Sequence, residues 1–213
     1  MKDNIVASLE LEKGFTNKFQ SYLVAEVKKR LKASISSITE SIEVALQTMV
    51  KTKLSEAPEV QSLAGGKLRY QFGLVDGAAR ISSIINIWAD SIEVTYVAKM
   101  GSLGGITINM RRNNYSDVIS VPEAVFVTEK GVKLEWLRWL LLEGDKRIVS
   151  NYFFKKSSRG RAGGGIMAER QNASWGVPSQ FAGTENNNFA TRALETINDE
   201  IDVLVRREIV KVL

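Results

Sequence analysis

The chain contains no cysteine and no histidine among its 213 residues. Without cysteine it forms no disulfide and has no thiolate nucleophile. The two absences together exclude zinc sites built on these residues and the Ser-His-Asp triad. Only carboxylate, lysine, tyrosine and hydroxyl groups remain for chemistry. The composition therefore argues against an enzyme, and we expect no catalytic residue, no metal site and no cofactor.

Long apolar runs are missing as well. A helix that spans a bilayer needs about 20 consecutive apolar residues, whereas the densest apolar stretch, Trp136 to Leu142, is short and contains Arg138. The first residues, Met1 to Asn4, show no basic region followed by an apolar run, so no secretory signal is predicted. We expect no membrane partner, and a protein that acts in the cytoplasm or in a particle assembled there.

What is present is typical of a soluble globular chain, with 44 % hydrophobic and 25 % charged residues. The formal net charge is +5. A solvated surface with a slight excess of lysine and arginine explains this charge. A nucleic-acid partner is the alternative, because proteins of that kind gather their basic residues on one face.

The first third of the sequence predicts one long amphipathic helix. Its apolar residues recur at gaps of three and four, which places them on one face of a helix. About 35 helical residues span roughly 50 Å, and a rod of that length usually lies across a sheet, packs on a partner chain or bends. We expect Pro58 to end the helical region, with a break at Ala64 to Gly66. The apolar positions are Phe15, Phe19, Leu23, Val27, Leu31, Ile35, Ile38, Ile42, Leu46 and Met49.

The rest of the chain alternates between short strands and helices. Period-two stretches predict strands, and apolar residues three and four apart predict helices. The expected strands are a weak one, or an irregular segment, at Lys67 to Leu74, a hairpin of Ile92 to Met100 and Ile106 to Met110 around a turn at Gly101 to Gly105, then Ala124 to Thr128 and Arg147 to Phe154. The expected helices are Ala78 to Ala89, one turn at Ser116 to Ser120, Lys133 to Leu142 with Gly144 as its cap, and a last helix that starts at Asn187 or Asn188.

This order predicts an α+β fold. The long N-terminal helix and the C-terminal helix should pack on a small, mainly antiparallel β-sheet with inserted short helices. The predicted organisation is a helical arm, residues 1–64, that packs on a main α+β domain, residues 65–213, as one structural unit.

A glycine-rich segment, Gly160 to Gly165, follows a basic run and contains Arg161. Such loops can bind phosphate through backbone amides, but the Gly-Lys-Ser/Thr pattern of a nucleotide-binding loop is absent. A mobile or bulged loop is the favoured interpretation. The basic side chains could instead contact DNA phosphates, with the aromatic residues at 152–154 available to stack on bases. The candidate DNA-facing residues are Lys155, Lys156, Arg159 and Arg161.

The stretch from Leu134 to Leu142 predicts a helix that is apolar on two faces. Trp136, Trp139 and Leu140 share one face. A helix of this kind is either buried in its own domain or shared with a neighbouring subunit, and tryptophan is frequent at such interfaces. Both alternatives stay open. The candidate subunit-interface residues are Trp136, Trp139, Leu140, Trp175 and Phe181.

Several short elements, in this order, resemble neck-type virion proteins of long-tailed bacteriophages. A tryptophan-rich helix is followed by a Ser-Arg-small-Gly turn, then by Trp-x-Val-Pro, Phe-Ala-Gly-Thr and Asn-aromatic-x-Thr-Arg-Ala elements. Gly160 and Arg161 lengthen the turn relative to the pattern. The likeness covers roughly Leu68 to Ala193. The elements are Leu134 to Leu141 with Gly144 and Asp145, Ser158 to Met167, Trp175 to Pro178, Phe181 to Thr184, and Asn188 to Ala193.

The resemblance implies a non-enzymatic virion protein at the head–tail junction, in a neck or tail-completion ring that links the connector to the tail. It implies a closed homo-oligomeric ring, commonly sixfold or twelvefold, around the DNA channel. The implied partners are the connector or head-closure proteins on one side and the tail terminator or tube proteins on the other, with non-specific contact to the DNA. A tail terminator and a basic nucleic-acid-binding module are the alternatives.

Overall fold

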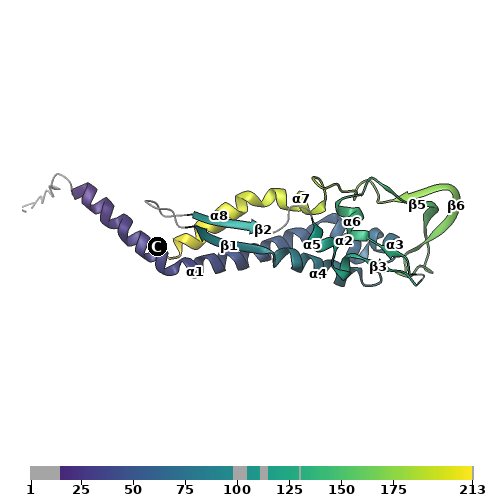
Figure 1. Ribbon diagram of the computed structural model, residues 1–213, viewed down its shortest axis with the longest axis horizontal. Helices are drawn as coiled ribbons and strands as arrows, with labels where there is room; N and C mark the ends of the chain where they lie inside the picture. The colour runs from purple at the N-terminus through teal and green to yellow at the C-terminus, as the bar shows by residue number, and fades with distance from the viewer. Residues whose placement is uncertain (1–14, 98–104, 111–114, 130, 213) are drawn as a thin grey trace, which may run out of the picture.

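The computed structural model describes residues 15–97, 105–110, 115–129 and 131–212. The molecule is elongated, with one long helix along most of its length and a curled hairpin at the opposite end (Figure 1). Helices alternate with antiparallel strand pairs, which confirms the predicted α+β class. In the described part of the chain, every helix is too short or too polar to cross a membrane.

Helix α1 (Phe15–Glu56) is the long N-terminal helix that the sequence predicts, and it is 42 residues long. At 1.5 Å per residue it measures about 63 Å. Helix α2 (Pro58–Gly65) follows directly, so Pro58 begins a helix instead of ending the helical region. Proline is favoured at this first position because its missing N–H would have no partner there. The predicted break is confirmed at Gly66, which separates α2 from α3.

The strand predicted at Lys67 to Leu74 is wrong, because the structure has helix α3 (Lys67–Phe72) there. Its two buried residues, Leu68 and Phe72, are four apart and so share one helical face. Gly73 ends the helix in a left-handed conformation, φ 64°, which glycine adopts without steric cost. Helix α4 (Gly77–Ala89) agrees with the prediction and buries Ile81, Ile84, Ile85 and Trp88.

Strands β1 (Ile92–Val97) and β2 (Gly105–Met110) form the predicted antiparallel hairpin, with Ile92 opposite Met110. The predicted continuation of β1 to Met100 and the turn at residues 101–104 lie outside the described residues. The next elements are α5 (Ser116–Ile119) and a short 3₁₀ helix, η1 (Pro122–Ala124). The single helical turn predicted at Ser116 is thereby confirmed.

Strands β3 (Phe126–Val127) and β4 (Lys133–Leu134) pair with each other. The helix predicted from Lys133 is therefore shorter, α6 (Trp136–Leu141), because its first two residues belong to β4. It ends at Leu142 rather than at a glycine cap. Gly144 has a different function: its N–H donates to the Gly183 carbonyl at 3.0 Å, and a side chain on it would overlap the backbone of Ala182 and Gly183.

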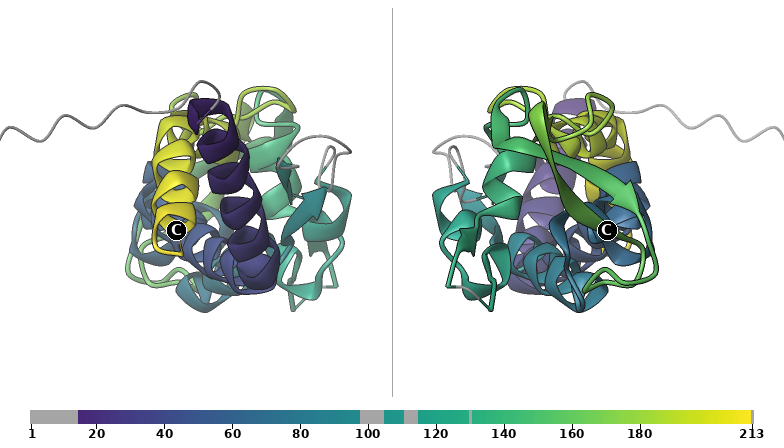
Figure 2. Two further views of the ribbon diagram at one scale, coloured as in Figure 1. Left: turned by 90° about the vertical axis from the view of Figure 1, so that its left-hand side faces the viewer. Right: turned by 90° about the vertical axis from the view of Figure 1, so that its right-hand side faces the viewer.

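Strands β5 (Arg147–Lys156) and β6 (Gly165–Gly176) form the longest hairpin. Its register shifts between Ser150 and Tyr152, where Asn151 and Asn172 both have positive φ and the Asn172 N–H donates to Asn151 Oδ1 at 3.3 Å. Such bulges increase the twist of a strand pair. The hairpin curls at the far end of the molecule (Figures 1 and 2). The strands thus form three separate two-stranded sheets, not the one small sheet predicted.

The C-terminal segment contains α7 (Phe189–Leu194), η2 (Glu195–Ile197) and α8 (Asn198–Val210). Helix α1 contacts α4, β1, α7 and α8. Its residues Ile38, Ile42, Leu46, Val50 and Leu54 belong to the same buried cluster as residues from the rest of the chain. The part of α1 from Ile38 onward is therefore the central element of the core.

Candidate functional site

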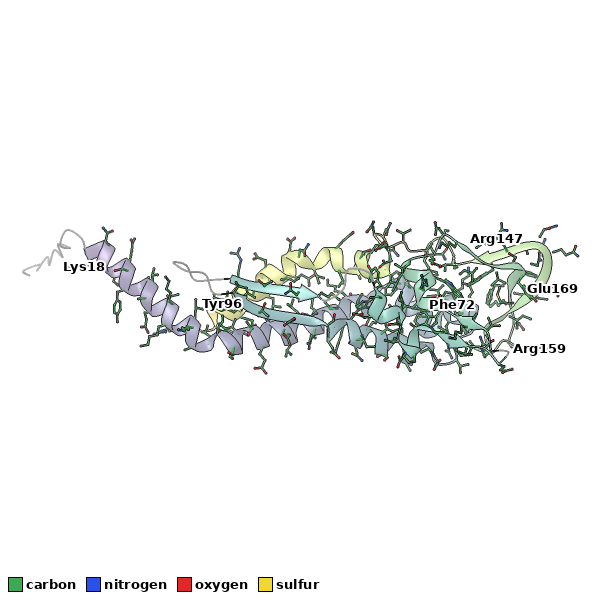
Figure 3. The ribbon with its side chains drawn as sticks, in the orientation of Figure 1. Lys18, Phe72, Tyr96, Arg147, Arg159 and Glu169 are labelled. Atoms are coloured by element: carbon green, nitrogen blue, oxygen red, sulfur yellow. The ribbon has the colours of Figure 1, made fainter. Side chains whose placement is uncertain are left out.

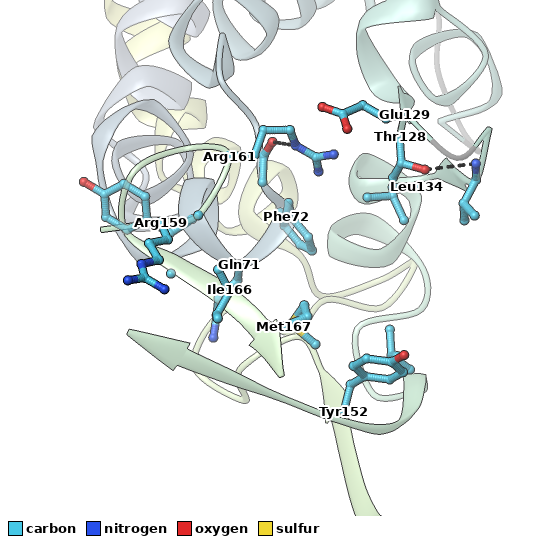
Figure 4. A pocket seen from close by; sticks show the side chains of 16 residues that line it. Gln71, Phe72, Thr128, Glu129, Leu134, Tyr152, Arg159, Arg161, Ile166 and Met167 are labelled. Carbon is cyan, nitrogen blue, oxygen red and sulfur yellow. Dashed lines mark hydrogen bonds between the residues drawn. The ribbon is translucent and has the colours of Figure 1, made fainter. Parts of the chain in front are cut away.

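An apolar cavity of about 570 Å³ lies at the far end of the molecule (Figure 4). Helix α3, the β3–β4 hairpin and the β5–β6 hairpin form its walls. Among the described residues, the buried Oε1 atom of Gln71 on this wall has no hydrogen-bond partner. A hydrogen-bond donor on an occupant would satisfy it. The apolar and aromatic lining includes Tyr70, Phe72, Val132, Leu134, Val149, Tyr152, Ile166 and Met167.

One edge of the cavity is the connection between β5 and β6, residues 157–164, which we call the glycine loop. Arg161 fastens this loop to the body of the protein. Its Nε donates to the Gly73 carbonyl at 2.8 Å, and its guanidinium lies 4.1 Å from the centre of the Phe126 ring. Burial lowers the pKa of Arg161 from its ordinary value, while the nearby Glu129 opposes that shift. Arg161 therefore fastens the glycine loop to α3 and β3, and its side chain remains exposed. Its assignment as a DNA-facing residue stays a prediction.

The glycines of the loop have a packing explanation. A side chain on Gly164 would overlap the ring of Tyr70, and one on Gly160 would overlap the backbone of Gly165. The Gly163 N–H donates to the Gly160 carbonyl at 2.7 Å, which closes a tight turn. The loop thus packs against α3, and Gly160 and Gly164 permit its close contacts, whereas Gly163 adopts a left-handed conformation, φ 83°.

The other three predicted basic residues, Lys155, Lys156 and Arg159, are exposed. They belong to a segment, residues 146–176, that carries seven lysines and arginines against the single Glu169, a net charge of +6. Within the described ranges, no ion pair joins these three residues to an acidic side chain. Figure 3 shows Arg147, Arg159 and Glu169 at this end. The β5–β6 hairpin is accordingly a strongly basic surface.

The predicted interface residues mostly lie inside the chain. Trp136 and Leu140 are fully buried and Trp175 is 9 % exposed. Phe72 packs on these rings, with centroid distances of 6.4 Å to Trp136 and 5.7 Å to Trp175. The core alternative therefore holds for these three, and the interface assignment is corrected because their surfaces are already covered. Trp139 and Phe181 are half-buried against the same cluster and keep part of their surface accessible.

Asn188 links the end of α6 to the start of α7. Its Oδ1 accepts from the N–H groups of Ala190 and Thr191 at 3.0 and 3.1 Å, and its own N–H donates to Thr191 Oγ1, which completes a capping box. Its Nδ2 donates to the carbonyls of Leu141 and Thr184 at 3.3 and 2.9 Å. The sequence predicted the helix start here but not the second set of bonds, since these depend on tertiary structure.

The sequence reasoning missed a surface at the opposite end. Phe19 and Leu23, which belong to the predicted core stripe, are 53 % and 51 % exposed, and Tyr22 and Val24 are exposed beside them. Figure 3 shows Lys18 on the same turns of α1, beyond the rest of the molecule. The signal that could have identified this surface is the dense basic run at residues 28–32 on the same helix.

Within the described residues, no group of three or more His, Cys, Asp or Glu side chains is arranged to bind a metal ion. Comparison of the chain with protein-family models, with curated proteins and with solved structures finds no match.

Proposed function

We propose that this protein is a structural, non-enzymatic virion subunit that forms a ring at a phage head–tail junction, in the neck or at tail completion. The observation that carries the proposal is the elongated subunit with two unlike ends, an exposed apolar helix at one and a basic hairpin beside a cavity at the other. Unlike surfaces on one subunit suit heterologous contacts, and these form a ring where the rotation from one subunit to the next closes.

The elements behind the resemblance support the proposal in a specific way. Trp175 packs on Phe72, Gly183 approaches the carbonyl of Leu140, and Asn188 caps α7. The first contact holds the end of β6 against α3, and the other two hold the connection between β6 and α7 against α6. Residues of this kind maintain the fold of the subunit. The resemblance to neck-type proteins therefore concerns the fold, and the surfaces that bind specific partners lie at the two ends of the molecule.

In this proposal the partners are further copies of the chain, a connector or head-closure ring on one side, and tail terminator or tube proteins on the other. In the described part of the chain, the cavity and the exposed helix are two surfaces that suit these contacts. The protein then resides in the virion, after assembly in the host cytoplasm, and requires no cofactor.

Electron microscopy of the intact particle tests this proposal. The chain should be traceable as a ring between the capsid portal and the tail. Light scattering of the purified protein, alone and with its neighbouring virion proteins, should give a defined oligomer in at least one mixture. A chain that is absent from the particle and monomeric in every mixture contradicts the proposal.

A second candidate function is nucleic-acid binding by the β5–β6 hairpin. The observation that favours it is the net charge of +6 over residues 146–176, since this exceeds the +5 of the whole chain. Tyr152, with 38 % of its surface exposed, offers a ring for stacking. Such a hairpin would bind backbone phosphates without reading sequence, either in a free module or in a ring through which DNA passes.

Salt-dependent binding to duplex DNA tests this second candidate. The triple change Lys155→Glu, Lys156→Glu and Arg159→Glu should weaken binding and reduce the slope of log affinity against log salt by about three, since each phosphate contact contributes close to one. The matched control reverses three exposed lysines at the opposite end, Lys18, Lys28 and Lys29. Equal losses in both variants would show that the hairpin has no special role.

A further inference from the structure

The cavity beside the glycine loop joins a buried apolar surface to an exposed one. Phe72 is 2 % exposed and Leu134 is half-buried, whereas Val132, Tyr152 and Ile166, which also line the cavity, are 55 %, 38 % and 36 % exposed. Figure 4 shows several of these side chains around the open space. A hollow with apolar walls and an exposed apolar rim is typical of a binding site.

The charge of the walls restricts the occupant. The segments that form them, residues 67–73, 126–134 and 146–176, contain eleven lysines and arginines against Glu129 and Glu169, a net charge of +9. Of the charged residues that line the cavity itself, Glu129 interacts with Arg161. Arg159 is exposed, and within the described ranges no ion pair joins it to an acidic side chain. The site therefore favours a negatively charged occupant and disfavours a basic one.

A third requirement comes from Gln71. This residue lines the cavity, and among the described residues its buried Oε1 atom has no hydrogen-bond partner. The occupant should therefore supply a hydrogen-bond donor. A peptide offers a backbone N–H at nearly every residue, an apolar side chain for the cavity and carboxylates for Arg159. A nucleic acid supplies negative charge, but the polar edges of its bases make burial in an apolar cavity unfavourable.

We propose that this cavity binds a short acidic peptide segment of a neighbouring protein. One aromatic or branched aliphatic side chain of the segment packs against Phe72, a backbone N–H donates to Gln71 Oε1, and carboxylates lie beside Arg159. An apolar anchor in a pocket with charged residues around it is the usual arrangement of the strongest contacts in protein interfaces. The inference rests on the proposed function, in which the neighbouring protein belongs to the virion.

Selection from a library of random peptides on the intact protein tests the chemistry of the occupant. The enriched peptides should share acidic residues around a Phe, Trp, Leu or Ile. Fluorescence anisotropy of one labelled enriched peptide then measures its affinity. Enrichment of basic peptides, or of peptides without a common pattern, overturns the inference.

Two valines of the β3–β4 hairpin locate the binding site. Val132 and Val127 are both 55 % exposed, but Val132 lines the cavity and Val127 does not. Val132→Glu should weaken binding of the enriched peptide about tenfold, because it places a like charge at the rim. Val127→Glu is the matched control and should change the affinity less than about twofold. Equal affinities of the two variants overturn the inference.

The polar contacts have their own measurements. Gln71→Met removes an acceptor that has no partner within the described protein. It should weaken the peptide about fivefold without lowering the melting temperature, since only a bond to the ligand is lost. Unchanged affinity overturns the placement of the peptide against Gln71.

Charge reversal distinguishes the peptide from DNA. Arg159→Glu should weaken peptide binding several-fold more than Lys156→Glu, because Lys156 is exposed on the same hairpin but does not line the cavity. Equal losses in both variants, together with displacement of the peptide by duplex DNA, would assign this surface to nucleic acid and overturn the inference. Dissociation of a homo-oligomer by Val132→Glu would make the occupant a second copy and also overturn it.

These results separate the inference from the proposed function. Cavity-dependent peptide binding by a chain that is absent from virions keeps the site and removes the head–tail ring. A chain traced in the neck that selects no acidic peptide keeps the ring and removes this site.

Discussion

At the scale of single residues, Asn188 connects three segments of the chain. It is fully buried and bonds to α7, to the last turn of α6 and to the turn at Thr184. A buried amide with both ends satisfied fixes the relative position of these segments. Removing the amide leaves buried N–H and C=O groups without partners, which is costlier than the loss of one bond.

We predict that Asn188→Ala lowers the free energy of unfolding by about 2–3 kcal/mol, because the loss of a helix cap adds to that of the buried bonds. Urea denaturation followed by tryptophan fluorescence measures this change. Asn186→Ala, at an exposed position in the same turn, is the control and should stay within about 0.5 kcal/mol of the wild type. An equally small effect at Asn188 would contradict the capping role.

The stability of the fold depends on pH through Glu208. Its carboxylate accepts hydrogen bonds from Lys211, Ser41 and Arg207, and these bonds lower its pKa to about 2 against an ordinary value of 4.5. A depressed carboxyl pKa stabilises the fold above pH 4.5, and this contribution is lost as the pH falls toward 2.

We therefore predict that Glu208→Gln is less stable than the wild type at pH 7 and that the difference shrinks between pH 4.5 and pH 2. Urea unfolding of both proteins at a series of pH values measures the difference. A gap that stays constant over this range would mean that the carboxylate charge does not contribute.

Single residues also show what the sequence could and could not predict. The start of the last helix at Asn188 follows from local capping chemistry, and the structure agrees. The roles of Trp136 and Leu140 could not be predicted in this way. An apolar pattern on two faces fits a core helix and an interface helix equally well, and only the position of Phe72 and its neighbours decides for the core.

At the scale of elements, the β5–β6 hairpin with its glycine loop combines rigidity with exposed charge. Bulges at Asn151 and Asn172 curl the strands, and Arg161 secures the loop against Gly73 and Phe126. The neighbouring Lys155, Lys156 and Arg159 stay exposed to solvent. The hairpin therefore holds exposed basic side chains on a backbone that is fixed by tertiary contacts.

We predict that Arg161→Lys loosens the loop and lowers the free energy of unfolding by about 1 kcal/mol, because an ammonium cannot reproduce the planar stacking on Phe126. Hydrogen exchange should accelerate at the amide of Gly163, which is bonded to Gly160 within the loop. Arg159→Lys, an exposed change in the same loop, is the control and should leave that exchange rate unaltered. Unchanged protection in both variants would show that Arg161 does not secure the loop.

Helices and hairpins with strong periodicity could be predicted, and ambiguous short segments could not. In α3, residues Leu68, Tyr70 and Phe72 alternate as a strand would, while Leu68 and Phe72 also have helical spacing. Burial of the two positions against the core favours the helix. The pairing of β1 with β2 could be predicted, because the two strands are neighbours in sequence. The separation of the described strands into three sheets could not, because it depends on the tertiary positions of the helices between the hairpins.

At the scale of the whole molecule, the net charge of +5 is unevenly distributed along the chain. The β5–β6 hairpin region, residues 146–176, contributes +6 and residues 17–32 of α1 contribute +4, so the remaining residues sum to −5. The two basic regions lie at opposite ends of the long axis (Figure 3). An arrangement of this kind favours contacts between one molecule's end and another molecule's middle, since like ends repel.

The division of α1 into an exposed part and a core part predicts opposite effects of two truncations. Removal of residues 1–25 deletes only exposed side chains among the described ones, and the melting temperature should stay within a few degrees of the full chain. A fragment of residues 65–213 lacks Ile38, Ile42, Leu46, Val50 and Leu54, all buried. At about 1.5–3 kcal/mol for each buried side chain, the loss is comparable to the whole stability of an ordinary domain, about 5–15 kcal/mol.

That fragment should therefore lose its near-ultraviolet circular dichroism and its cooperative thermal transition, whereas the chain that begins at residue 26 keeps both. The predicted boundary at residue 64 would then separate two segments of one folding unit. Cooperative unfolding of residues 65–213 alone would contradict this, because it would require the region after α2 to bury enough apolar surface without α1. The comparison thereby decides whether the long helix is a removable arm or, as its buried stripe indicates, an arm only in its first turns and core in the rest.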